Sequence, residues 1–439
     1  MGHPAHNGTV TTTSILSDVR LGLAGADDTV DLTLRDGEII AVAPHSDAPS
    51  GAQPEGEPNA QRIDGRGLLA IPGLINTHAH VDKSWWGRPW QSFGGPPGLE
   101  GRISHERARR DELGIPGVDV TREVLRQFLR HGTTAIRTHV DVDLGVGLRG
   151  IDVVREAVEQ TCPAMRCTVV AFPQDGALRR PGVVDLLRRA AEEGVEHVGG
   201  LDPAGIDRDP AGQLDALFDI ADATGCGIDI HLHDPGDLGA FEFELIIERT
   251  RALDLKGRVN IAHGFALADV PAGRARDLAE QMAELEISLT SVAPVGRAPM
   301  PARMLRDVGV RLGLGTDGIR DLWSPYGTGD MMEIARQHAR MTGARYDEEL
   351  LQVLDQTSTA AEWFVGSTGE GERSPGGTGS EVTGWAGGTD DPAAAVGLGV
   401  GSRADIVLLD AENPMDALVR APARQLVLVG GEIAHDESR

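Results

Sequence analysis

Cysteine and long apolar stretches are both scarce in this chain of 439 residues. Its three cysteines, Cys162, Cys167 and Cys226, are too few and too far apart for a disulfide framework or a cysteine-rich zinc site. No apolar run approaches the roughly 20 residues that a transmembrane helix needs. These absences argue against a disulfide-stapled module and against a protein that spans the membrane.

Positive charge is scarce as well, because 41 Lys and Arg residues stand against 67 Asp and Glu residues. The formal net charge of −26 at pH 7 argues against nucleic acid and anionic membranes as partners. Residues 1–13 lack the basic and apolar blocks of a signal peptide, so we expect a cytoplasmic protein. We expect a small-molecule substrate, and a homo-oligomer is compatible with the sequence.

Uninterrupted apolar runs alternate with helical patterns through the middle of the chain. Runs of this kind are typical of strands buried on both faces. Residues 181–194 show the helical type, with Val183, Leu187 and Ala190 in an apolar stripe that stops at Gly194. The strand-like runs lie near residues 74–80, 134–141, 165–172, 195–200, 227–233, 259–263, 287–292 and 310–316. Eight strands joined by helices predict an α/β fold, a (β/α)₈ TIM barrel.

Shorter segments with alternating apolar and polar residues occur at both ends of the chain. Residues 30–34 and 38–42 flank an Asp36-Gly37 turn, and residues 404–409 and 425–429 repeat the pattern. Neither end has enough strands to be stable alone, so we expect both to build one small β-sandwich domain. The predicted boundaries are 14–69 with 401–436 for this composite β domain, 70–366 for the barrel and 367–400 for a flexible Gly-rich insertion.

The first strand-like run of the barrel ends in His78-Ala79-His80. Side chains at positions i and i+2 of a strand point the same way, so both imidazoles leave one face. Two neutral imidazoles on one face form half of a metal site. Taken alone, the pair is equally well explained as two surface histidines.

Further polar residues follow the fifth, sixth and eighth runs at His231, His263 and Asp317. The active sites of TIM barrels lie at the end of the barrel formed by the C-terminal ends of the strands, and these residues follow such strand ends. Alone, His231 is compatible with a core histidine and Asp317 with a helix N-cap. Their coincidence with the His-x-His pair favours a metal site of nitrogen and oxygen donors that leaves room for water.

The full set of motifs resembles the amidohydrolase superfamily over nearly the whole chain. It comprises Pro72-Gly73, His78-Ala79-His80, His231, His263 and Gly315-Thr316-Asp317. Further motifs are similar to those of the cytosine deaminase-like branch. They are His78-Ala79-His80-Val81-Asp82, Arg137-Thr138-His139-Val140-Asp141, Ala171-Phe172-Pro173-Gln174-Asp175-Gly176, and Asp317 followed by Asp321-Leu322-Trp323-Ser324-Pro325-Tyr326-Gly327-Thr328.

The resemblance implies one divalent metal ion per chain, zinc or iron. The implied ligands are His78, His80, His231 and Asp317. Superfamily members with two metals commonly bridge them with a carboxylated lysine on a middle strand. This chain has only two lysines among its 41 basic residues, Lys83 and Lys256, and neither lies on a middle strand. We therefore predict a single metal.

The resemblance also implies a mechanism, in which metal-bound hydroxide attacks the amino-bearing carbon of a heterocycle and releases ammonia. His263 and Asp317 would take or orient the proton of the water. Asp234 would protonate the ring nitrogen and the leaving group. Family members usually have a glutamate at that position, so the shorter aspartate is a departure that alters the reach of the acid.

Three residues are the implied substrate contacts. Gln174 would hold the amide-like edge of the substrate, and Trp323 would wall the pocket; the alternatives are a polar residue at a strand end and a core tryptophan. Cytosine deaminases carry a second aspartate where this chain has Gly318, so we expect room for a larger or substituted ring. His233, Asp82, Lys83 and His139 are expected near the site in supporting or structural roles.

The preferred interpretation is a metal-dependent hydrolytic deaminase of an amino-substituted nitrogen heterocycle, similar to cytosine or isocytosine. The nearest alternative is a related hydrolase that releases an alkylamine or opens a cyclic amide. A non-catalytic homologue is a third interpretation, but the intact set of metal ligands argues against it.

Overall fold

The computed structural model describes residues 13–22, 28–46, 60–366 and 392–439. The chain divides into two compact units, one built from both chain ends, up to Gly73 and from Thr383, and the other spanning Leu74–Val382. Most of the predicted 367–400 insertion lies outside the described residues; its end contains the short helix α12 (Pro392–Ala395) and the buried Leu398. Within the described ranges, no helix has the length and apolarity to cross a membrane.

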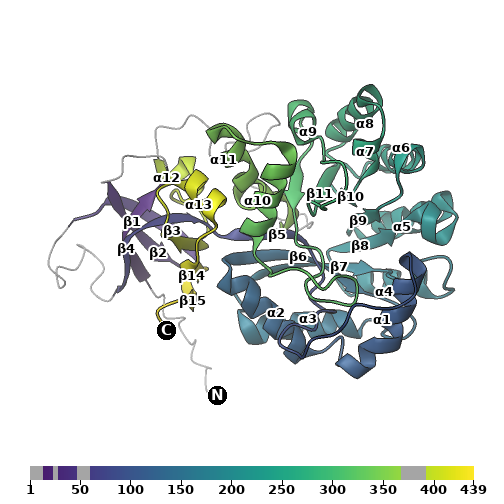
Figure 1. Cartoon of the computed structure of the whole chain (residues 1–439), viewed down its shortest axis with the longest axis horizontal. Helices are drawn as coiled ribbons and strands as arrows, with labels where there is room; N and C mark the ends of the chain where they lie inside the picture. The colour runs from purple at the N-terminus through teal and green to yellow at the C-terminus, as the bar shows by residue number, and fades with distance from the viewer. Residues whose placement is uncertain (1–12, 23–27, 47–59, 367–391) are drawn as a thin grey trace, which may run out of the picture. The chain divides into compact units, whose positions relative to one another are not determined.

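The larger unit is a barrel of eight parallel strands, which confirms the predicted fold (Figure 1). The strands are neighbours in chain order, and a parallel bridge between Ala79 and Asp317 joins the first strand to the segment after the last. They are almost entirely buried, which explains their uninterrupted apolar sequences. The strands are β5 (Leu74–Ala79), β6 (Thr133–Asp141), β7 (Arg166–Phe172), β8 (His197–Leu201), β9 (Gly227–Leu232), β10 (Val259–His263), β11 (Ser288–Ser291) and β12 (Leu312–Leu314).

Helices surround this barrel, as Figure 1 shows. In α2 (Val118–Arg130), Val120, Val124 and Phe128 recur at four-residue spacing and are buried. The helix predicted over 181–194 is α4 (Val183–Glu192). The others are α1 (Leu99–Leu113), α3 (Arg149–Thr161), the π-helical turn η1 (Pro203–Asp207), α5 (Pro210–Thr224), α6 (Gly236–Ala252), α7 (Ala266–Asp269), α8 (Ala272–Glu284), α9 (Ala302–Val308), α10 (Met331–Thr342), α11 (Asp347–Asp355) and the 3₁₀ helix η2 (Thr359–Phe364).

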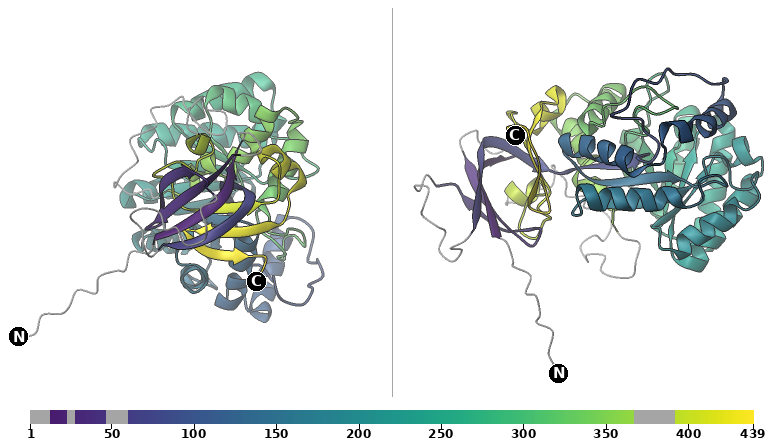
Figure 2. Two further views of the ribbon diagram at one scale, coloured as in Figure 1. Left: turned by 90° about the vertical axis from the view of Figure 1, so that its left-hand side faces the viewer. Right: turned by 90° about the horizontal axis from the view of Figure 1, so that it is seen from below.

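The smaller unit is a mixed sheet of seven strands in the order β15-β14-β13-β4-β1-β2-β3. Strand β4 pairs with β1 in parallel and with β13 antiparallel, so strands from the two chain ends lie side by side (Figure 2). The prediction of a β domain built from both ends is therefore confirmed. Its elements are β1 (Thr13–Leu21), β2 (Thr29–Arg35), β3 (Glu38–Pro44), β4 (Gln61–Pro72), β13 (Ile406–Leu409), α13 (Pro414–Arg420), β14 (Arg424–Val429) and β15 (Glu432–Asp436).

Candidate active site

Three of the predicted metal donors meet where the barrel closes. His78 and His80 extend from the end of β5, and their Nε2 atoms lie 3.6 and 3.2 Å from Asp317 Oδ1. The backbone N–H of Asp317 donates to the His78 carbonyl at 2.9 Å, so the closure of the barrel sets these distances. Burial alone would raise the pKa of Asp317, but the two histidines outweigh it and hold the pKa well below its ordinary value. Asp317 therefore carries a full negative charge for a cation.

The fourth predicted donor, His231, reaches the same place from β9. Its Nε2 lies 3.2 Å from His80 Nε2, and its ring stacks on Phe172 with 4.1 Å between centroids. Burial, followed by the charge of Lys83, lowers the pKa of His80 to about 3, and burial also lowers the pKa of His231. Both imidazoles are therefore neutral, which is the form that binds metal ions.

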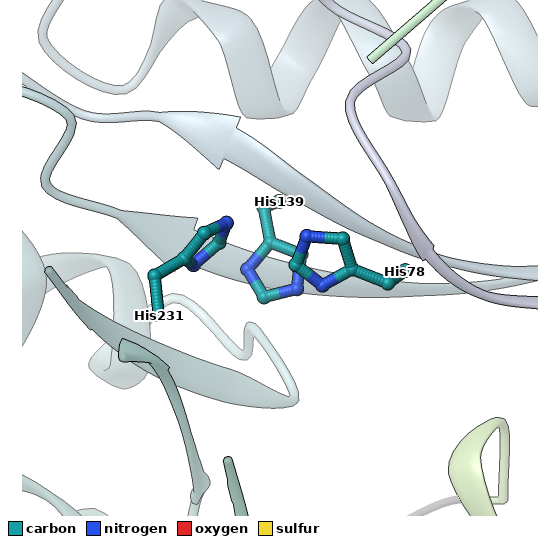
Figure 3. Close-up of side chains that lie close together, drawn as sticks. All are labelled: His78, His139 and His231. Atoms are coloured by element: carbon teal, nitrogen blue, oxygen red, sulfur yellow. The ribbon is translucent and has the colours of Figure 1, made fainter. Parts of the chain in front are cut away.

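A fourth histidine, His139, joins the cluster from β6. Its ring centroid is 4.2 Å from that of His78 and 4.5 Å from that of His231, and the three rings offer nitrogen atoms within 4.8 Å of one another (Figure 3). We expected His139 near the site in a supporting or structural role. The sequence did contain a signal for a role in the site, because Arg137, His139 and Asp141 alternate along one strand and their side chains therefore lie on the same face of β6.

Several buried ring nitrogens of this cluster have no hydrogen-bond partner within the described part of the chain. These are both nitrogens of His78, His139 and His263, and Nδ1 of His80 and His231. Buried polar atoms are rarely left unpaired, and three or four imidazoles beside a carboxylate fit zinc or iron. Neither lysine is available as a bridge, since Lys83 Nζ bonds Asp141 and Gln174 while Lys256 Nζ pairs with Glu286. The donor set thus fits a divalent ion held by His78, His80, His231 and Asp317.

His263 and His233 lie side by side next to these donors, with ring centroids 4.1 Å apart. His263 ends β10, and its centroid is 4.9 Å from that of His78. His233 Nδ1 lies 3.0 Å from Asp202 Oδ2, and the same carboxylate accepts the His233 backbone N–H. An imidazole oriented by a carboxylate is a recurrent arrangement in proton transfer. Local sequence carries no signal for this pairing, because Asp202 follows β8 whereas His233 follows β9.

Asp234, the predicted acid, makes a different set of contacts. Its Oδ2 accepts the Gly205 N–H of η1 at 2.9 Å, and its carboxyl group hydrogen-bonds the Glu242 side chain from α6. Burial, followed by the charge of Asp234, raises the pKa of Glu242 to about 9, and burial also raises the pKa of Asp234. The pair therefore holds a proton near neutral pH, as an acid requires.

The predicted substrate contacts lie at the ends of β7 and β12. Gln174 is buried and accepts a hydrogen bond from Lys83 at 2.7 Å. Trp323 is half-buried, and its indole N–H donates to Glu106 of α1. A Cβ atom added at Gly318 would lie 1.7 Å from Asp321 Oδ2. The space that we expected Gly318 to leave open is therefore filled by the Asp321 carboxylate.

Comparison with known proteins finds the same family that the sequence motifs resemble. Residues 69–368 match the amidohydrolase family. The chain belongs to this family. It is therefore an enzyme, a hydrolase, and the donor cluster at the barrel mouth is its candidate active site.

Two relatives and one solved structure are similar to this amidohydrolase. An uncharacterized protein of Escherichia coli K12 is 33% identical over 311 residues, which cover 70% of this chain and 66% of that protein, just under two thirds. The N-isopropylammelide isopropyl amidohydrolase of Pseudomonas sp. strain ADP is 28% identical over 384 residues, 84% of this chain and 87% of the relative. The crystal structure of N-isopropylammelide isopropylaminohydrolase from Burkholderia multivorans has a TM-score of 0.81 at 35% identity and covers 96% of this chain and 98% of that one.

Proposed function

We propose that this amidohydrolase removes an exocyclic amine from a nitrogen heterocycle by hydrolysis, with an alkylamine as the preferred leaving group. The observation that carries the proposal is the likeness to the Burkholderia multivorans isopropylaminohydrolase, which extends over 96% of the chain and includes both units. The cluster of His78, His80, His231 and Asp317 supports it, because hydrolysis at an electron-poor ring carbon needs an activated water.

We propose a single divalent ion, zinc or iron, as the cofactor. When bound, such an ion lowers the pKa of its water to about 7 and so supplies hydroxide at neutral pH. His263 borders the donor cluster and Asp317 belongs to it, and both would orient the water and accept its proton. The leaving nitrogen must be protonated to depart as an amine. Asp234, which is hydrogen-bonded to Glu242, would supply that proton, and His233 is the second candidate.

Ammonia release from an unsubstituted amino ring is a second candidate function, and Asp321 favours it. Cytosine deaminases carry a carboxylate directly after the metal-ligand aspartate. Here the Asp321 carboxylate fills the space beside Gly318, although it comes from a position farther along the chain. A carboxylate in this place accepts hydrogen bonds from an amino group but offers nothing to an alkyl chain.

A panel of matched substrates tests both candidates. Oxo-triazines and pyrimidinones that carry either an amino or an isopropylamino group would be incubated with the zinc- or iron-loaded enzyme, and ammonia and isopropylamine would be measured separately. We expect faster release of isopropylamine. Faster release of ammonia throughout would favour the second candidate, and release of neither amine would contradict the proposed function.

The identity of the acid is tested by two substitutions. Asp234→Asn is expected to keep the metal and to lower kcat by about 10²–10⁴-fold, the usual contribution of a positioned acid. His233→Asn serves as the comparison. Near-normal turnover of Asp234→Asn together with a large loss in His233→Asn would transfer the role to the His233–Asp202 pair.

A further inference from the structure

Lys83 occupies a buried position beside the metal donors. It follows β5, is only 3% exposed, and its Nζ lies 2.6 Å from Asp141 Oδ1 and 2.7 Å from Gln174 Oε1. The ammonium also lies 5.6 Å from the centre of the Phe172 ring, and that ring stacks on His231. Lys83 and Gln174 therefore line the same end of the barrel as the donors, on the β7 side.

The contact with Lys83 fixes which way the Gln174 amide faces. An ammonium group has three donors and no acceptor, so the amide atom that faces it must be the oxygen. The NH₂ group then lies in the same amide plane, on the other side of the Cγ–Cδ bond from the oxygen. No hydrogen bond engages Gln174 Nε2 in the ranges that the structure describes, and the side chain keeps 8% of its exposure. The Gln174 NH₂ group is thus a hydrogen-bond donor without a partner in the described residues, at the same end of the barrel as the candidate metal ligands.

Three acidic groups keep Lys83 in its charged form. Burial alone would lower the pKa of Lys83, but Asp141, Glu106 and Asp82 outweigh it and raise the pKa. The side chain of Glu106, on α1, also hydrogen-bonds Asp141. Lys83 is accordingly a permanent donor, and the orientation of Gln174 does not change with pH in the neutral range.

We propose that Lys83 is a positioning residue that makes Gln174 a hydrogen-bond donor, and that the enzyme selects rings with a carbonyl oxygen at the position facing Gln174. This inference rests on the proposed function and names its substrate class, the oxo-substituted aminoheterocycles. A ring with an amino group at that position would set two NH₂ groups against each other and leave both unpaired. A buried hydrogen-bond donor such as the Gln174 NH₂ group favours a ring with an acceptor strongly over a ring with a second donor, because the second donor leaves both groups without a partner.

The test compares two rings that differ at one exocyclic group and at the proton on the ring nitrogen next to it. Cytosine carries an oxo group where 2,4-diaminopyrimidine carries an amino group, and both are used at a pH at which they are uncharged. Dissociation constants are measured by calorimetry on the metal-loaded enzyme. The wild-type enzyme is expected to bind the oxo ring about ten- to hundredfold more tightly, which corresponds to one mismatched buried hydrogen bond.

Two variants separate the role of Lys83 from that of Gln174. In Lys83→Met the amide is free to turn, so the preference for the oxo ring should fall to near unity. Gln174→Glu keeps the contact with Lys83 but turns an oxygen toward the ring, so the preference should reverse. Lys256→Met is the matched control, because it is the same substitution at the other lysine of the chain, which is exposed and pairs with Glu286.

An oxo preference that persists in Gln174→Glu would overturn the proposal, as would an unchanged ratio in a Lys83→Met protein that retains its metal and melting temperature. If Lys83→Met does not fold, the reversal in Gln174→Glu decides alone. The outcome is independent of turnover. If the substrate panel releases no amine while the binding preference behaves as expected, the proposed function fails and the role of Lys83 stands.

Discussion

His231 contacts both His80, which follows β5, and His139, which lies on β6. Its Nε2 lies 3.2 Å from His80 Nε2 on β5, and its ring lies 4.5 Å from that of His139 on β6. We expect His231→Ala to lose metal and activity together, because the substitution removes one of the four proposed protein ligands. Elemental analysis after gel filtration measures the loss. His435→Ala, on β15 of the other unit, is the control, and full metal retention in His231→Ala would remove it from the ligand set.

Glu242 makes stability depend on pH in a predictable direction. Its pKa is raised from 4.5 to about 9 by burial and by Asp234, so the folded state favours the protonated acid. The stabilisation is complete below the unfolded pKa and is lost as the pH rises through the folded value. The melting temperature should therefore fall between pH 4.5 and about 9, and Glu242→Gln should reduce that fall. The variant keeps an oxygen for the Ala204 N–H, which Glu242 Oε1 accepts at 2.7 Å. An equal fall in both proteins would contradict this account.

Asp321 occupies the space that a side chain at residue 318 would need. The Asp321 carboxylate accepts the backbone N–H groups of Trp323 and Ser324 at 2.8 Å each, and an added Cβ would lie 1.7 Å from its other oxygen. We expect Gly318→Ala to displace Asp321 and the backbone of Trp323, and so to raise KM while the metal is retained. Steady-state kinetics and metal analysis check this. Unchanged KM would mean that Trp323 does not contact the substrate.

Helix α1 is attached to the barrel mouth by buried charges. Arg110 bonds both oxygens of Asp143, at 2.5 and 3.1 Å, and Glu106 accepts the indole N–H of Trp323. Arg110→Leu leaves the buried Asp143 carboxylate without its cation, although Asp143 Oδ1 still accepts the N–H groups of Gly145 and Val146. Removing one partner of a buried ion pair costs up to about 3–5 kcal/mol. We expect faster hydrogen exchange along α1 and a higher KM with little change in metal content. Arg109→Leu is the matched control on the same helix, since its pair with Glu112 is partly exposed and stabilises little. Equal effects of the two substitutions would show that α1 is not held by Arg110.

The elements of the barrel were predictable from the sequence, whereas contacts between its loops were not. Buried parallel strands leave an uninterrupted apolar signal, and β5 to β12 lie where the eight runs do. Strand periodicity also places His78 and His80 on one face. The pairing of Asp202 with His233 joins residues that follow two different strands, and the pairing of Glu106 with Trp323 joins helix α1 to the segment after β12. Local sequence carries no record of such pairings. Asp321 is the clearest case, because it fills space that the sequence around Gly318 predicted to be open.

At the scale of the whole barrel, the candidate metal ligands join strands that are far apart in the chain. His78 and His80 come from β5, His231 from β9, and Asp317 from the segment that closes the barrel after β12. A metal that binds only the folded state stabilises it by mass action, about 4 kcal/mol at 1,000 times Kd. We therefore expect chelation to lower the melting temperature.

Titration with zinc or iron should restore the melting temperature with an end point at one equivalent per chain. The donors include several imidazole nitrogens, whereas Mg²⁺ prefers oxygen ligands, so Mg²⁺ should not replace these metals. The absence of a bridging lysine favours the single equivalent, because Lys83 is held by Asp141 and Gln174. An end point at two equivalents in an active preparation would contradict the mononuclear site. In that case His139, whose ring nitrogens lie unpaired beside His78 and His231, would be the first residue to test as a ligand of the second ion.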